Sequence, residues 1–139
     1  MKRTVFAVAV AAAALIVPIT GSTHGAPHRG TVTVADEPLP NLPGKRLVSR
    51  IVNYAPGESL ASHRHAPSAF IYAHVLSGQI RSQVDGEPVR IYRPGEVWFE
   101  RPGAHHRVSA NASDTEPAQL LAIIVFDEAD GQLTIPDPR

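Results

Sequence analysis

Residues 56–65 read PGESLASHRH, and residues 95–111 read GEVWFERPGAHHRVSAN. Each stretch joins a glycine-containing turn to a short run that ends in or contains histidines. Pro-Gly pairs recur at 56–57, 94–95 and 102–103, and Asp85-Gly86 adds a fourth turn signal. Short runs of strand-forming residues separated by such turns are typical of all-β sandwiches and barrels.

The chain around these stretches is a succession of short runs rich in Val, Ile, Tyr and Phe, and none of them has a sustained helical period. Asp85-Gly86 lies between two alternating runs, which predicts a tight hairpin. In the run 70–76, the odd-numbered residues are expected to face inward. The expected strands cover 47–54, 59–65, 70–76, 79–84, 88–92, 96–100, 106–110 and 118–126.

His63 and His65 are two residues apart in an expected strand, so both imidazoles project from the same face. Such a pair supplies half of a metal site, because imidazole binds Zn, Fe, Ni and Cu well. Taken alone, the pair fits a structural or solvent-facing role better than a metal site. His105 and His106 offer a third ligand, and only one of them can join the site because adjacent strand residues point to opposite faces.

Two ordered motifs resemble those of the cupin family. The first is carried by Gly57, His63, His65 and Gly78. The second is carried by Gly95, Pro102, Gly103, His106 and, slightly displaced, Asn111. Residues 79–94 separate the two motifs, a spacing similar to that of small, single-domain, type-2-like bacterial cupins.

This resemblance implies an all-β fold, the double-stranded β-helix or jelly-roll barrel. It also implies that His63, His65 and His106 bind a divalent metal ion within the barrel. His106 is preferred to His105 because it stands three residues after Gly103, where the family places its histidine.

The chain departs from the family pattern in two places. Residues 66–72 read APSAFIY and lack the glutamate that usually follows the first two histidines, and Arg101 replaces a proline of the second motif. Glu100 is the best candidate for the missing fourth ligand, although a surface contact with Arg101 or Arg107 would explain it equally well.

Two further side chains are weaker candidates for the fourth ligand. His74 is expected on the outward face of its strand, and Gln83 on the outward face of a hairpin. A site of three histidines plus water is a third possibility, since catalytic metals commonly leave positions open.

The two ends of the chain differ in composition from the barrel. Lys2 and Arg3 precede an apolar run closed by Pro18, which predicts a signal peptide over 1–25 and export to the periplasm or the outside, with no stable membrane anchor after cleavage. Residues 26–45 are expected to form an extended arm with an edge strand at 31–35, residues 46–130 the barrel and residues 131–139 a tail.

The charge balance and the resemblance together define the expected partners. Without Lys2 and Arg3, 11 basic residues stand against 13 acidic ones, so nucleic acid is an unsuitable partner. The chain has no cysteine, and therefore no disulfide stabilises it. The resemblance allows a homodimer, in which residues 31–35 could extend a partner's sheet.

Two functions stay open from the sequence. The first is an exported enzyme in which Fe, Mn, Ni or Zn acts on a small oxygen-bearing molecule, either as a dioxygenase-like oxidoreductase or as an isomerase that uses Lewis-acid chemistry. The second is a non-catalytic module that binds a small ligand or uses the metal structurally. No catalytic acid or base is assigned. Three neutral donors would leave the metal strongly positive, which favours anionic substrates.

Overall fold

The computed structural model describes residues 29–138, and the signal peptide expected at 1–25 lies outside them. Strands make up nearly all of the regular structure, and the only helical element in the described part is a 3₁₀ turn, η1 (Glu128–Asp130). No helix among these residues is long and apolar enough to span a membrane. The prediction of an all-β architecture is confirmed.

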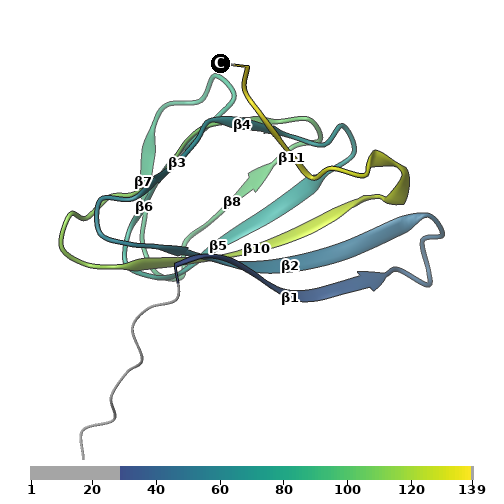
Figure 1. The fold of residues 1–139 in the computed structure, drawn as a ribbon, viewed down its shortest axis with the longest axis horizontal. Helices are drawn as coiled ribbons and strands as arrows, with labels where there is room; N and C mark the ends of the chain where they lie inside the picture. The colour runs from purple at the N-terminus through teal and green to yellow at the C-terminus, as the bar shows by residue number, and fades with distance from the viewer. Residues whose placement is uncertain (1–28, 139) are drawn as a thin grey trace, which may run out of the picture.

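Two antiparallel sheets lie opposite each other, as Figure 1 shows. The first sheet has the strand order β1-β2-β10-β5-β8, and the second has the order β11-β4-β9-β6-β7, with β3 also paired to β9. The strands are β1 (Gly30–Pro38), β2 (Lys45–Tyr54), β3 (Ser59–Leu60), β4 (His63–His65), β5 (Phe70–Ser77), β6 (Ile80–Val84), β7 (Arg90–Tyr92), β8 (Val97–Glu100), β9 (His105–Asn111), β10 (Ala118–Asp127) and β11 (Thr134–Pro136).

All eight expected strands are present, with one subdivision. The run 59–65 forms two short strands, β3 and β4, which both pair with β9. Residues 31–35 belong to β1, which pairs antiparallel with β2 at the edge of the first sheet. Within the tail expected at 131–139, Leu133 is buried and β11 pairs with β4.

Alternation of side chains along the strands builds the core between the sheets. In β5, Ile71, Ala73 and Val75 are at most 2% exposed, whereas the residues between them face outward, as the sequence predicts. Trp98 also points inward and packs on Tyr92, with ring centroids 4.6 Å apart. The inner faces of the two sheets therefore enclose two apolar clusters, one that includes Val75 and Trp98 and one that includes Val48 and Ile71.

The turn that connects β5 to β6 depends on Gly78, which has a φ of +68°. A Cβ at this position would lie 2.5 Å from the carbonyl oxygen of Pro117 and 2.6 Å from the Cβ of Ala118. A side chain here is therefore excluded both by the backbone conformation and by close packing against the start of β10.

The substitution Gly78→Ala is expected to lower the free energy of unfolding by about 3 kcal/mol, the sum of the left-handed backbone penalty and the overpacking penalty. Gly95→Ala is the matched control, because Gly95 has a φ of +86° but no neighbouring atom within 4 Å of the place that a Cβ would take. It should cost only about 1–2 kcal/mol. Urea denaturation measures both values, and equal losses would show that the contact with Pro117 and Ala118 is unimportant.

Candidate metal centre

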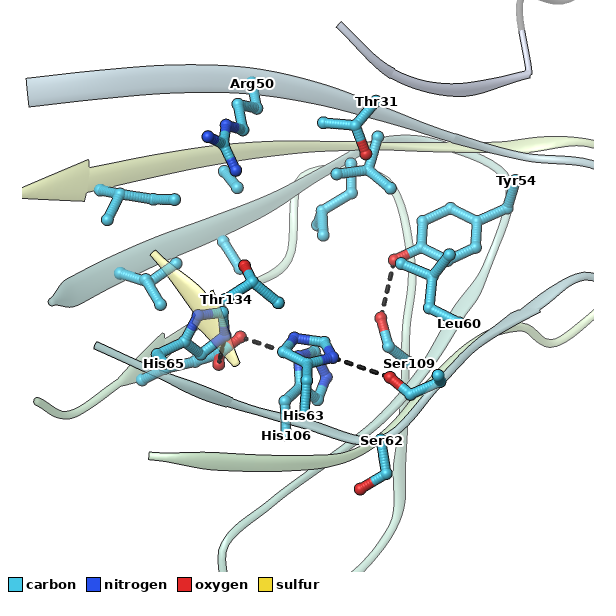
Figure 2. Close-up of a pocket in the computed structure, with 18 of the residues that line it drawn as sticks. Thr31, Arg50, Tyr54, Leu60, Ser62, His63, His65, His106, Ser109 and Thr134 are labelled. Carbon is cyan, nitrogen blue, oxygen red and sulfur yellow. Dashed lines mark hydrogen bonds and ion pairs between the residues drawn. The ribbon is translucent and has the colours of Figure 1, made fainter. Parts of the chain in front are cut away.

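Three histidines from two neighbouring strands converge at one point of the interior. His63 and His65 lie on β4, and His106 lies on β9 directly opposite His63 in the strand register. Each residue offers a ligand atom within 4.8 Å of the other two. The ring centroid of His63 is 4.9 Å from that of His65 and 5.3 Å from that of His106. Figure 2 shows the three rings gathered at one end of a cavity.

Hydrogen bonds to the chain orient the three rings. The Nδ1 of His63 is 2.8 Å from the carbonyl oxygen of Ala61, and the Nδ1 of His65 is 3.3 Å from that of Leu133. Because a carbonyl can only accept, each Nδ1 carries the hydrogen and the Nε2 lone pair is left for a ligand. For His106, the Nε2 lies 3.0 Å from the hydroxyl of Ser82, and the Nδ1 faces Glu100.

Glu100 is buried beside these histidines, at 2% exposure. The strand β8 alternates outward and inward side chains, so Trp98 and Glu100 share the inner face. The Glu100 Oε2 lies 2.8 Å from the Nε2 of His65, and the Oε1 lies 3.3 Å from the Nδ1 of His106. The indole Nε1–H of Trp98 donates to the Glu100 Oε1 at 3.1 Å. Glu100 is therefore an interior residue and not a surface partner of Arg101 or Arg107.

The protonation states of the site favour a cation. Burial lowers the pKa of His106 to about 4, and burial also lowers that of His63. Burial by itself raises the pKa of Glu100, but its contacts with His65 and His106 outweigh that effect and bring the pKa below its usual 4.5. At neutral pH, His63 and His106 are therefore neutral donors next to a charged carboxylate, as metal binding requires.

Acidification is expected to destabilise the metal-free protein between pH 6.5 and about 4. In this window the unfolded chain, with a histidine pKa of 6.5, binds a proton that folded His106 does not. Stability is therefore fully present above pH 6.5 and falls by about 1.4 kcal/mol per pH unit for this one residue. Urea denaturation at several pH values measures the slope. His106→Asn should reduce the slope, the remainder coming from His63, whose pKa is also lowered by burial, and an unchanged slope would contradict the assignment.

Gln83 and the remaining histidines of the described part, His74 and His105, lie outside this cluster. His105 is buried on the opposite side of β9 from His106, where its Nε2 lies 2.7 Å from Asp137 and 3.0 Å from the hydroxyl of Ser62. The sequence expectation that only one of the two adjacent histidines joins the site agrees with this placement, and His105 is on the outward side of β9, where it is buried. His74 contacts Tyr72 on the outer face, and Gln83 donates to the Glu87 carbonyl.

The donor set fits a divalent metal ion. The Nε2 of His65 and the Oε2 of Glu100 are both buried, and neither has a hydrogen bond of proper geometry among the described residues, although the two atoms lie only 2.8 Å apart. Buried polar atoms without hydrogen bonds are rare and call for an explanation such as an ion. Nitrogen donors from histidine with a carboxylate oxygen suit Zn, Fe, Mn or Ni.

A cavity of about 270 Å³ opens beside the four residues. Its walls are mostly apolar, with Val52, Ile71, Leu120 and Ile124 among them. Tyr54 also lines the cavity. Its hydroxyl lies 2.7 Å from that of Ser109, and burial raises its pKa to about 12, so it stays protonated. A small, largely apolar molecule with a polar end would fit such a space.

The sequence interpretation missed Arg50, which lines this cavity from β2. The signal was present, because Val48, Arg50, Val52 and Tyr54 share the parity of one strand face and three of them are apolar or aromatic. An arginine in the row of core-facing residues is unusual.

Comparison with known proteins agrees with this geometry. Residues 50–124 match the family model described as "Cupin domain". A curated relative, the cupin-domain-containing oxidoreductase fogC of Aspergillus ruber, is 28% identical over 78 residues, which are 56% of this chain and 37% of that protein. The chain thus spans little more than a third of this relative's length.

Two solved structures share the fold. A protein with a double-stranded β-helix domain from Klebsiella pneumoniae has a TM-score of 0.54 at 22% identity, covering 83% of this chain and 89% of that one. An oxalate oxidase has a TM-score of 0.54 at 19% identity, covering 77% of this chain and 55% of that one. The sheet topology, the matched domain and the histidine cluster lead to the same conclusion: the chain belongs to the cupin family.

Proposed function

We propose that this cupin binds a divalent metal ion through His63, His65, His106 and Glu100 and uses it to act on a small oxygen-bearing molecule held in the adjacent cavity. The observation that carries the proposal is the convergence of three histidine nitrogens within 4.8 Å, with a buried carboxylate against two of them. The metal belongs to the set Fe, Mn, Ni or Zn, and the reaction is dioxygenase-like or a Lewis-acid reaction.

The ion, when bound, would supply a Lewis acid with open positions for an oxygen-bearing ligand. The chain's own residues orient and shield this site. Trp98 holds the Glu100 carboxylate through its indole N–H, and the carbonyls of Ala61 and Leu133 fix the rings of His63 and His65. The cavity walls are mostly apolar, and electrostatic interactions are stronger in such a low-polarity environment than in water. The name of the relative fogC, an oxidoreductase, and the likeness to an oxalate oxidase support oxygen chemistry.

A non-catalytic role is the second candidate, and one observation favours it. Among the described residues that line the cavity, Glu100 is the only acidic one, and its oxygens already contact His65, His106 and Trp98. With no second carboxylate available for proton transfer, the site could serve to bind a small ligand or to hold the two sheets together around a metal.

Metal analysis of the purified full chain tests the proposal first. The protein should hold close to one equivalent of a divalent ion after reloading, and less than about 0.2 equivalents under all conditions would contradict it. Oxygen uptake over catechols, flavonols and keto acids then separates the two candidates. Uptake supports dioxygenation, whereas metal binding with silent traces favours Lewis-acid chemistry or ligand binding.

We also propose that the chain is exported by the segment 1–25. Mass spectrometry of the protein recovered from outside the cytoplasm should show a start between residues 23 and 27. Homodimer formation through β1 stays a prediction, which light scattering on the purified chain measures.

A further inference from the structure

Arg50 lines the barrel interior from a face of β2 on which its nearest neighbours, Val48 and Val52, are apolar. On β2, Val48, Val52 and Tyr54 are 3%, 9% and 2% exposed, and Arg50 has the same strand parity. Figure 2 shows its guanidinium pointing away from β2 into the cavity that also contains the histidine cluster. The charge is therefore directed at the same space as the metal centre.

Small neighbours leave room around this guanidinium. The strand register places Ala122 of β10 opposite Arg50, and Ala73 of β5 opposite Ala122. Both alanines line the cavity. The short side chains of these alanines leave space next to Arg50, and a bound molecule can lie between the guanidinium and the histidines.

Arg50 has no charged partner among residues 29–138. Its Nε is buried without a hydrogen bond. Asp36, on the strand β1 that pairs with β2, is already bound by Arg46 at 2.6 Å. Arg46 also lies 3.3 Å from Glu128. Glu100, the single acidic residue of the cavity wall in the described part, contacts His65 and His106. A half-buried cation with a buried, unpaired Nε and no counter-charge is unfavourable for a fold, which points to a ligand that supplies the charge.

We propose that Arg50 binds the carboxylate of the small molecule that occupies the cavity. The planar guanidinium pairs with a carboxylate through two parallel hydrogen bonds. The apolar body of the molecule packs on Val52, Leu120 and Ile124, and its other end reaches the histidine cluster. This inference rests on the proposed function, since it names the substrate class for the same site as carboxylates with an apolar body.

Hexanoate and hexanamide serve as probes, because they share one apolar chain and differ in the charge of the head group. Isothermal titration should show that the wild-type protein binds hexanoate more tightly than hexanamide. Arg50→Met should weaken hexanoate binding by about 10- to 100-fold, the usual loss for a charge-assisted hydrogen bond, and change hexanamide binding by less than about 2-fold. Arg50→Lys should recover part of the loss. Arg81→Met, which removes an exposed arginine on β6, is the matched control and should change neither.

Each titration is run on metal-free and metal-loaded protein, so that this inference and the proposed function can fail separately. Equal hexanoate affinity in the wild type and Arg50→Met, or no preference for hexanoate over hexanamide, would overturn the inference even where metal binds normally. A chain that binds no metal but selects hexanoate through Arg50 would refute the proposed function and support the inference. The melting temperature of ligand-free Arg50→Met should be unchanged or higher. A fall of more than about 5 °C would give Arg50 a structural role and overturn the inference.

Discussion

His106→Ala is expected to lower the affinity for a divalent ion by at least about 100-fold, because it removes one of the four proposed donors. In the wild type, metal at one hundred times its dissociation constant should stabilise the fold by about 2.7 kcal/mol. For a domain of this size that corresponds to a rise in melting temperature of roughly 10 °C. The variant should show no such rise, and a chelator should leave its melting temperature unchanged.

His74→Ala is the matched control for this experiment, because His74 lies on the outer face of β5, where its Nδ1 is 3.5 Å from the hydroxyl of Tyr72. It should keep the full response to metal and to chelator. Scanning calorimetry with and without metal measures all three proteins. A melting temperature of the wild type that is indifferent to both metal and chelator would show that the histidine cluster is purely structural.

Glu100→Gln is expected to weaken metal binding by about 10- to 100-fold while leaving the fold intact. The amide keeps the size of the side chain but removes the negative charge that faces His65 and His106. The hydrogen bond from Trp98 can persist, because the amide oxygen accepts as well. Competition with a chelator of known affinity measures the change.

Glu96→Gln supplies the matched control for the carboxylate. Glu96 lies just before β8, four residues from Glu100, and accepts a hydrogen bond from the backbone N–H of Arg93 on the surface. Its variant should bind metal as the wild type does. If Glu100→Gln also binds metal with unaltered affinity, Glu100 is not a ligand, and the site consists of three histidines with open positions.

Glu100 supplies a carboxylate at the histidine cluster although the first motif lacks its usual glutamate. Residues 66–72 contain no carboxylate, and in the sequence this looks like the loss of a ligand. In the fold, the inner face of β8 brings a carboxylate from a different strand to the same histidines. The electrostatic consequence is a site with one negative charge, whose ion would be less positive than one held by three neutral histidines alone.

Local chemistry was sufficient to predict much of the structure from the sequence. The glycine turns and alternating runs located the eight strands, and period-two alternation placed Ile71, Ala73 and Val75 inside and His74 outside. The same rule kept His63 and His65 on one face and allowed only one of His105 and His106 into the cluster. These features depend on neighbours a few residues apart, which a strand pattern records directly.

Contacts between distant segments were decided only by the tertiary structure. Strand β8 has four residues, too few for its alternation to show which face is inside, so the direction of Glu100 depended on its pairing with β5. The sequence of β11 has no strong hydrophobic alternation, and this segment forms a strand because it pairs with the edge strand β4. His105 is held by Asp137, which lies 32 residues away in the sequence. The period of the strands was thus enough to predict the shared face of His63 and His65, whereas the positions of Glu100 and Arg50 depend on how the two sheets pack together.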